Sequence, residues 1–255
     1  MIGKKVTVTV DRPLGSFHPE HPDMYYPINY GYVEGIAAPD GEEQDVYILG
    51  VDSPVKEFTG RIIAVIRRND DIEDKWVAAP DGISFTKEEI AEKVHFQEQY
   101  FQSKIYTSFI RKAVPDDAVR IAEIEVFNYR LNFYPIFKCD KFYFSDLNVF
   151  SEAKRYAKKT DSIYVYDDES VKGFVSIDEK EIVQLFVEPV LQGQTIGSQL
   201  LEFAVKEKGT EFLYVLEKNR RAADFYHRHG FILTNDKKYE EGTEELLIKM
   251  VRKPI

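Results

Sequence analysis

A turn between an apolar strand and an amphipathic helix holds the residues of this chain that are best placed to do chemistry. The strand covers residues 181–187, and the turn runs from Gln192 to Gly197. The helix after the turn leaves its first backbone N–H groups without intrahelical acceptors, and the helix dipole adds partial positive charge at the same point. Because such helix starts bind phosphate, the turn predicts an enzyme that binds a cofactor through a pyrophosphate group.

The composition of the chain narrows the classes of partner. The 255 residues carry a formal net charge of -10, which argues against nucleic acid, because a basic face normally supplies the binding energy there. No run approaches the roughly 18 apolar residues of a membrane span, so we expect no membrane contact and a cytoplasmic protein. Cys139 is the only cysteine, which excludes an internal disulfide, and we interpret it as a small buried residue.

Two regions of different pattern must position these residues. Before residue 105, short alternating segments separated by Pro, Gly and Asp turns predict a small β-rich unit, closed by one helix with Thr86 as N-cap and Glu89 at the capping-box position. From Phe109 on, strands and amphipathic helices predict helices layered on a sheet. We therefore expect two domains, residues 1–106 and 107–255. The second has expected helices at 115–124, 147–159, 196–205 and 219–229, and strands at 163–166, 171–177, 181–187, 212–216, 231–234 and 245–251.

Two motifs of the second region resemble the GNAT superfamily of N-acetyltransferases. They are Gln192-Gly193-Gln194-Thr195-Ile196-Gly197 and Asn219-Arg220-Arg221-Ala222-Ala223-Asp224-Phe225-Tyr226-His227-Arg228-His229-Gly230-Phe231, and the strand at 212–216 lies between them. The resemblance covers about residues 107–255. It implies an α+β fold layered around a central mixed sheet, and an acetyl-CoA-dependent N-acetyltransferase that acts on a small-molecule or peptide amine by direct attack.

The resemblance also assigns roles to residues. The turn would bind the pyrophosphate of coenzyme A through backbone N–H groups, and the end of the preceding strand would hold the pantetheine arm and the thioester. Tyr226 would protonate the departing thiolate, and Asn219 would reach the cofactor arm. The residues implied in cofactor binding are Leu185, Phe186, Val187, Gln192, Gly193, Gln194, Thr195, Ile196, Gly197, Ser198, Asn219 and Tyr226. Those implied in acceptor binding include Tyr129, Asn132, Phe133, Tyr143, Tyr239, Glu240 and Glu241.

Some positions near this turn leave alternatives open. An attacking amine must first lose a proton, and Glu181 is our candidate general base, directly or through water, with Glu188 as the alternative. Thr195 stands where the family usually has glycine. A β-branched residue disfavours a positive φ, so either cofactor affinity is lowered, or the turn adjusts, or the hydroxyl donates to a phosphate. We interpret His227 and His229 as complements to the dipole of a helix end.

The first region resembles the soluble inorganic pyrophosphatases with a five-stranded barrel. The resemblance covers about residues 4–103 and rests on Tyr26-Pro27-Ile28-Asn29-Tyr30-Gly31-Tyr32 and Asp40-Gly41-Glu42-Glu43-Gln44-Asp45-Val46. It implies a Mg²⁺ site at Asp40, Glu42 and Asp45, with Asp70 from a second acidic segment. Clustered carboxylates suit such hard divalent cations.

Departures from this second family are serious. Thr7 and Thr9 stand where that family has a lysine and a glutamate. His18 stands where it has an arginine, and Phe101 where it has another lysine. Phosphate recognition depends on such cations, so we expect a degenerate domain attached to an N-acetyltransferase. Two alternatives are a magnesium-dependent pyrophosphatase with a regulatory coenzyme A-binding domain, and a coenzyme A sensor without catalysis. If the acidic turn binds no metal, we expect it to be only a solvated loop, and the barrel to serve as a support or in a homodimer.

Overall fold

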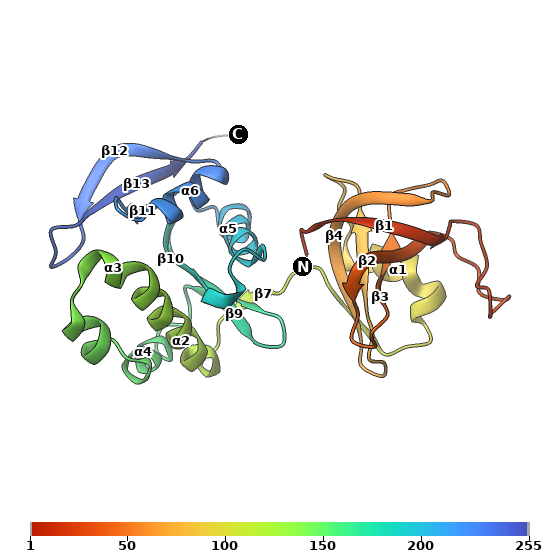
Figure 1. Cartoon of the computed structure of the whole chain (residues 1–255), viewed down its shortest axis with the longest axis horizontal. Helices are drawn as coiled ribbons and strands as arrows, with labels where there is room; N and C mark the ends of the chain where they lie inside the picture. The colour runs from red at the N-terminus through yellow and green to blue at the C-terminus, as the bar shows by residue number, and fades with distance from the viewer. Residues whose placement is uncertain (1, 254–255) are drawn as a thin grey trace. The chain divides into compact units, whose positions relative to one another are not determined.

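The chain folds into two compact units (Figure 1). The structure is a computed structural model that describes residues 2–253. The first unit extends to Ser108 and the second begins at Phe109, whereas the pattern change in the sequence lies near Tyr106. Within the described residues, no helix is both long and apolar enough to cross a membrane.

The first unit is a closed five-stranded β-barrel with one additional strand. Pairing runs in the order β1-β2-β3-β5-β4, and β4 pairs back onto β1, which closes the barrel; β6 extends β4. The strands are β1 (Lys5–Arg12), β2 (Asn29–Ala37), β3 (Glu43–Ile48), β4 (Glu57–Arg68), β5 (Asp74–Ala79) and β6 (Ser103–Tyr106). Closure leaves the barrel without a free edge, which supports the predicted barrel architecture.

One helix packs against this barrel. Helix α1 (Lys87–Glu98) begins at the predicted N-cap, where the Thr86 side chain accepts from the N–H of Glu89 and the Glu89 carboxylate accepts from the N–H of Thr86. This capping box is confirmed. Ile90 and Val94 of α1 are fully buried against tyrosines and aliphatic residues of the barrel. Strand β2 contains the end of the aromatic motif used for the family resemblance.

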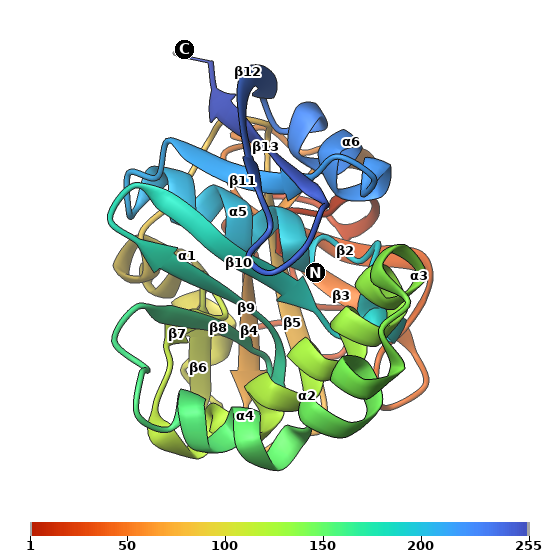
Figure 2. The same ribbon diagram turned by 90° about the vertical axis from the view of Figure 1, so that its left-hand side faces the viewer.

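The second unit is built on a seven-stranded mixed sheet. The strand order is β12-β13-β11-β10-β9-β8-β7, which can be followed in Figure 2 from the top to the lower left. All neighbours are antiparallel except β10 and β11. The strands are β7 (Ile110–Lys112), β8 (Ile163–Asp167), β9 (Val171–Asp178), β10 (Glu181–Val187), β11 (Phe212–Leu216), β12 (Phe231–Tyr239) and β13 (Leu246–Arg252).

Helices cover both faces of this sheet, as the alternation along β9 shows. A Cβ atom on Gly173 would lie 3.2 Å from Leu200 and 3.3 Å from Ile196, both on α5 (Ile196–Lys206). The next residue, Phe174, points to the opposite face and joins the core formed with α2 (Ala118–Asn128) and α4 (Val149–Tyr156). Glycine at 173 therefore lets the start of α5 approach the sheet closely.

The segment between α2 and α4 was expected only as a connection between two helices, but it has helical turns of its own. It contains the short elements η2 (Tyr129–Phe133), α3 (Tyr134–Phe137) and η3 (Phe142–Asp146), of which η2 and η3 are π-helical. Pro135 in the first turn of α3 cannot donate a backbone hydrogen bond, and Lys138 ends this turn in the left-handed conformation. Cys139 follows and is exposed, so our interpretation of it as a buried residue was wrong.

Candidate active site

A gap opens between the two parallel strands at the centre of the second sheet. Strands β10 and β11 pair only at Glu181 with Phe212 and at Ile182 with Leu213. A bulge follows in β10 between Ile182 and Gln184, and the rest of β10 pairs with β9 alone. The last residues of β10 therefore present one side of their backbone to the gap instead of to a neighbouring strand.

A cavity of about 420 Å³ lies at this gap. Its walls come from the end of β10, the turn before α5, the first residues of α5, helix α6 (Arg220–Arg228) and the end of α2. The structure brings together most of the residues predicted to bind a cofactor: Leu185, Phe186, Val187, Gln192, Gly193, Thr195, Gly197, Ser198, Asn219 and Tyr226. Two others do not line it, since Gln194 is exposed and Ile196 is buried against the sheet.

The turn before α5 presents backbone donors to this cavity. Within the described chain, the N–H groups of residues 193–198 have no backbone acceptor, and the first intrahelical bond is donated by Gln199 to the carbonyl of Thr195. Gly193 adopts a φ of 84°, with open space where a Cβ would lie. The turn and helix start therefore form the anion-binding arrangement that the sequence pattern predicts.

Thr195 adopts the conformation that its side chain disfavours. As the N-cap of α5 it has a φ of 68° and a ψ of -10°, in the left-handed region. The hydroxyl makes no capping bond and instead accepts from the Gln199 side chain at 3.2 Å. The turn has thus kept the left-handed geometry of a glycine, and the strain of a β-branched residue at positive φ is of order 1 kcal/mol.

Gln192 belongs to a polar network that the sequence did not indicate. Its side-chain amide donates to Asn128 Oδ1 at 3.1 Å and to the carbonyl of Val187 at 3.3 Å. Asn128, which is buried on α2, also donates to the Val187 carbonyl at 3.0 Å. The Val187 carbonyl is therefore already satisfied, and the free backbone groups of β10 lie earlier in the strand.

Two arginines of α6 add positive charge to the same cavity. Arg221 donates to Gln192 Oε1 at 2.7 Å, which holds its guanidinium beside the turn. Arg228 lines the cavity two turns further along α6. Within residues 2–253 neither arginine forms an ion pair, so both guanidinium groups can face an anion. The seven-residue spacing of Arg221 and Arg228, which puts both on one face of a helix, was a signal in the second motif.

Tyr226 lines the cavity, and within the described chain only burial, with no hydrogen bond, acts on its phenol. Its ring packs between Phe225, at 5.2 Å between ring centroids, and Phe231, at 6.0 Å. Burial raises the pKa of the Tyr226 phenol well above its usual value. The hydroxyl is therefore protonated at neutral pH and is able to act as a proton donor.

Asn219 is the N-cap of α6, as predicted. Its side-chain oxygen accepts from the N–H of Ala222 at 3.2 Å. This bond fixes the start of α6 beside the end of β11 and leaves the amide group of Asn219 facing the cavity that it lines.

His229 differs from our interpretation of it as a dipole complement at an exposed helix end. It is half-buried, lines the cavity and stacks on Phe225 with ring centroids 4.6 Å apart. Its Nδ1 lies 2.8 Å from the carbonyl of Phe225, and its Nε2 lies 3.0 Å from Ser198 Oγ. His227, in contrast, is exposed. The spacing of four residues between Phe225 and His229, which puts both on one face of a helix, was the sequence signal that His229 lies beside Phe225.

The carboxylates proposed as general base lie outside the cavity. Glu181 is half-buried at the closed end of the strand pair, four residues or about 13 Å along β10 from Leu185. Glu188 is ion-paired with Arg120 at 2.6 Å. A proton leaving an amine in the cavity would therefore reach either carboxylate only through intervening water.

Another carboxylate, which the sequence did not indicate, lies nearer the middle of β10. Glu125 of α2 is buried and accepts from Gln184 at 2.8 Å and from Arg155 at 2.9 Å. Burial raises the pKa of Glu125, although Arg155 opposes the shift. Because its oxygens are already bonded to Gln184 and Arg155, this group supports the strand and does not face the cavity.

The far end of the cavity is aromatic. Phe133 and Phe186 line it, and their rings are 6.2 Å apart; Tyr129 packs against both, at 4.9 Å and 5.8 Å. Asn132 adds a polar group at this end. Two of the residues predicted to contact the acceptor, Asn132 and Phe133, therefore lie at the cavity, while Tyr239 is exposed on β12.

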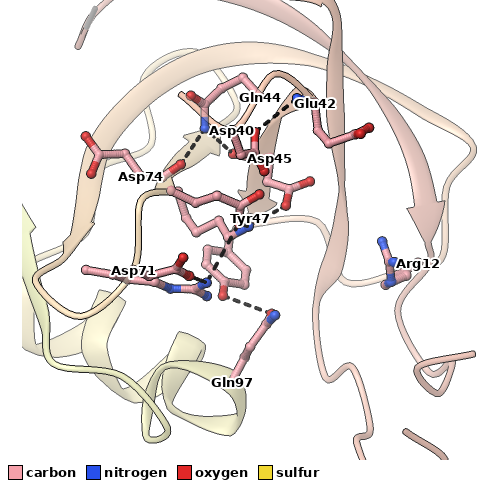
Figure 3. A network of polar contacts seen from close by, with 12 residues as sticks. Arg12, Asp40, Glu42, Gln44, Asp45, Tyr47, Asp71, Asp74 and Gln97 are labelled. Atoms are coloured by element: carbon pink, nitrogen blue, oxygen red, sulfur yellow. Dashed lines mark hydrogen bonds and ion pairs between the residues drawn. The ribbon is translucent and has the colours of Figure 1, made fainter. Parts of the chain in front are cut away.

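The predicted Mg²⁺ site of the first unit does not form. Within the described residues, no three His, Cys, Asp or Glu side chains are grouped so as to hold a metal ion. Asp40 accepts from the N–H of Glu42 at 3.0 Å, while the carboxylate of Glu42 is turned away from it (Figure 3). Asp70 accepts from the N–H of Gln102 instead. The structure therefore gives no support to these residues as metal ligands.

Two buried cations occupy the acidic cluster of this barrel. The ammonium group of Lys75, a residue with a 4% exposed side chain, is bonded to both Asp45 and Glu73. Arg68 pairs with Glu98 at 2.6 Å and with Asp71 at 3.0 Å. Internal lysine and arginine side chains therefore neutralise the carboxylates.

Comparison with known proteins agrees with the geometry of the second unit. Residues 159–233 match the family model described as an acetyltransferase (GNAT) domain, and this segment includes β10, the turn, α5, β11 and α6. The second unit therefore contains a GNAT domain, the domain of acetyl-CoA-dependent N-acetyltransferases. No curated protein matches the chain.

Several solved structures are similar to the chain. An N-acetyltransferase from Staphylococcus aureus Mu50 has 15% identity and a TM-score of 0.47, over 56% of this chain and 100% of that chain. The PaiA N-acetyltransferase from Thermoplasma acidophilum in complex with coenzyme A has 22% identity and a TM-score of 0.40, over 55% and 96%. A putative acetyltransferase from Salmonella typhimurium with its cofactor acetyl-CoA has 18% identity and a TM-score of 0.41, over 55% and 90%.

Proposed function

We propose that the second unit transfers an acetyl group from acetyl-CoA to a primary amine by direct attack. The observation that carries the proposal is the early end of pairing between β10 and β11, which opens a cavity with Tyr226 on one wall and a phosphate-binding turn at its mouth. A strand edge, a proton donor and an anion site thus converge on one space. This combination suits an acyl thioester that carries a pyrophosphate.

The residues present fit the groups of coenzyme A. The acceptor-free N–H groups of residues 193–198 and the side chains of Arg221 and Arg228 would hold the phosphates. The free backbone of β10 around Leu185 would hold the amide groups of the pantetheine arm by strand-like hydrogen bonds. Acetyl-CoA, when bound, supplies an activated acetyl thioester.

The side chains of this unit would then move two protons. Tyr226, kept protonated by burial, donates its phenolic proton to the sulfur as the carbon–sulfur bond breaks and the electron pair moves to sulfur. The attacking amine forms the new carbon–nitrogen bond and loses a proton to water, and Glu181 is our candidate to receive it through that water. Phe133 and Phe186 would exclude bulk water from the reacting end.

We infer in addition that the first unit is a degenerate relative of the pyrophosphatase barrels. The closed five-stranded barrel and the aromatic motif support this inference. The bonds of Lys75 to Asp45 and Glu73 argue that this barrel does not use its acidic turn for Mg²⁺. We therefore propose no hydrolytic step for it.

The test of transferase activity is thiol release from acetyl-CoA with a panel of amines, with acetylated product confirmed by mass spectrometry. The panel should contain polyamines, amino acids and peptides with free N-termini. Thiol release that requires an amine and is lost in Tyr226→Phe supports the proposal. Binding of acetyl-CoA without acetylation of any amine would instead favour a coenzyme A sensor.

A further inference from the structure

His229 and Ser198 form a pair at the phosphate end of the cavity, and neither the family match nor the proposed reaction uses the histidine. Ser198 is the third residue of α5, beside the acceptor-free N–H groups, and His229 follows the last turn of α6. Both side chains line the cavity. The pair therefore joins two helices where the cofactor phosphates are expected.

The hydrogen bonds of His229 restrict its proton positions. Nδ1 lies 2.8 Å from the carbonyl oxygen of Phe225, which can only accept, so Nδ1 carries a hydrogen in every protonation state. Nε2 lies 3.0 Å from Ser198 Oγ and has two options. In the neutral imidazole, Nε2 accepts the hydroxyl hydrogen of Ser198; in the imidazolium, Nε2 donates to the serine oxygen.

These two options present different groups to the cavity. While Nε2 accepts, the Ser198 hydroxyl hydrogen points at the histidine and the oxygen offers only lone pairs to an anion. When Nε2 donates, the hydroxyl hydrogen is free to turn toward a phosphate oxygen. A phosphate at the start of α5 therefore favours the protonated histidine, both through its charge and through the hydrogen bond that it gains.

The other charged groups near the histidine come from α5 and α6. Arg221 and Arg228 of α6 line the same cavity. Asp224 of α6 is exposed. Glu202 of α5 lies one turn beyond Ser198 and is ion-paired with Lys206, and β12 begins with the apolar Phe231 and Ile232. A bound phosphate would thus be the charge that changes most at His229.

We propose that His229 is a positioning residue that takes up a proton when the cofactor binds and thereby turns the Ser198 hydroxyl toward a phosphate. The proposal rests on the proposed function, since it needs coenzyme A in this cavity. It adds a residue to the cofactor site and couples cofactor affinity to pH. Linkage limits the effect to about tenfold in affinity per pH unit for one proton.

The test is calorimetric titration with 3′-dephospho-coenzyme A in two buffers of different ionisation enthalpy, which measures the protons taken up. This probe keeps the pyrophosphate but lacks the phosphomonoester, whose second pKa near 6 would add its own proton uptake. The variants are His229→Gln, whose amide always donates, and Ser198→Ala. His227→Gln is the matched control, because His227 is exposed and does not line the cavity.

We expect net proton uptake near neutral pH in the wild type and in His227→Gln, none in His229→Gln, and reduced uptake in Ser198→Ala, in which only the phosphate charge still favours the imidazolium; both variants should still bind. Uptake that persists in His229→Gln would assign the proton to another group and overturn the proposal. Undiminished uptake in Ser198→Ala would overturn the role of the serine. Binding by the wild type without uptake would overturn the inference alone, whereas no binding would overturn the proposed function as well.

Discussion

Ile182 and Leu213 form the last pair between the parallel strands β10 and β11. Past this pair, β10 has a bulge between Ile182 and Gln184 and then pairs with β9 alone. The cavity lies beside Leu185, where β11 no longer pairs with β10. The site is therefore built into the register of the sheet, and the turn and α6 only complete it. Residues that act in this cavity and residues that only hold its walls should then respond differently to substitution.

Tyr226→Phe should lower turnover without weakening cofactor binding. The phenol has no partner in the described chain, so removing it leaves no unsatisfied protein group, while the departing sulfur loses its proton donor. General acid catalysis contributes about 10²- to 10⁴-fold, so kcat should fall within that range. Steady-state thiol release measures the effect, with the exposed Tyr100→Phe of the first unit as control. Equal turnover in the two variants would remove the acid role.

Thr195→Gly should stabilise the second unit slightly, because it relieves a β-branched residue at a φ of 68°. The gain should be about 1 kcal/mol at most, since glycine also increases the entropy of the unfolded chain. Thr195→Ser separates the two roles, since it keeps the hydroxyl at the same φ. If the hydroxyl binds phosphate, the serine variant should keep the acetyl-CoA affinity that the glycine variant loses. Higher affinity in the glycine variant would show that strain is the larger effect.

Glu181→Gln tests the general base. If Glu181 receives the proton through water, the variant should lose activity at neutral pH and regain part of it at higher pH, where more of the amine is already deprotonated. The matched control is Glu207→Gln, since Glu207 is exposed and does not line the cavity. A pH–rate profile measures both. An unchanged pH–rate profile in Glu181→Gln would show that Glu181 is not the base and that the amine loses its proton directly to solvent.

Glu98 should make the stability of the first unit depend on acid pH. Burial alone would raise the pKa of Glu98, but hydrogen bonds from Arg68, Ser103 and Tyr47 outweigh it and hold the pKa below the usual value. A lowered pKa contributes stability above the ordinary carboxylate pKa of about 4.3, and this contribution is lost as the pH falls through the folded-state pKa.

Glu98→Gln should accordingly destabilise the first unit by about 1–3 kcal/mol at neutral pH, because Arg68 loses its buried carboxylate partner and keeps the ion pair with Asp71. The difference from the wild type should shrink below about pH 4. Urea unfolding followed by tryptophan fluorescence reports on this unit alone, since Trp76 is the only tryptophan and lies in β5. The exposed Glu92→Gln on the same helix is the control. A constant difference at all pH values would refute the linkage.

Lys75→Met should cost the first unit about 1–3 kcal/mol, because Asp45 and Glu73 would face each other without a cation. Mg²⁺ should then stabilise the variant and leave the wild type unchanged. Thermal unfolding followed by Trp76 fluorescence, with and without MgCl₂, compares the two. A rise in the wild-type midpoint with Mg²⁺ would show that the barrel binds the metal despite its lysine.

Much of the second unit could be predicted because its signals are local. The strand at 181–187, the cap at Asn219 and the turn at 192–197 are each set by neighbouring residues, and the structure has them. The π-helical turns around Pro135 could not be predicted, because the helical period changes there without a change in composition. Strand β12 also continues to Tyr239, well past Thr234, through a bulge that its polar residues conceal.

The residues missed at the two sites share one cause. Asn128, Glu125 and His229 act through partners 30 to 64 positions away in the chain, such as Arg155, Ser198 and Gln192. Such pairings depend on the packing of α2, α5 and α6, which the sequence pattern does not specify. The metal prediction found no support for the same reason, since the acidic spacing gave no sign that Lys75 and Gln102 would bond to Asp45 and Asp70.

The most direct measurement for the central claim is calorimetric titration of acetyl-CoA into the wild type and Gly197→Val. A Cβ on Gly197 would meet Phe225 and Val187 at ordinary contact distances of 3.5 and 3.6 Å, so there is room for the first side-chain carbon, and two further methyl groups should crowd the cavity that Gly197 lines; circular dichroism of the variant checks that it folds. The account predicts micromolar binding by the wild type and at least about tenfold weaker binding by the variant, a loss of about 1.4 kcal/mol. Equal affinity in both proteins would place the cofactor elsewhere and contradict the account.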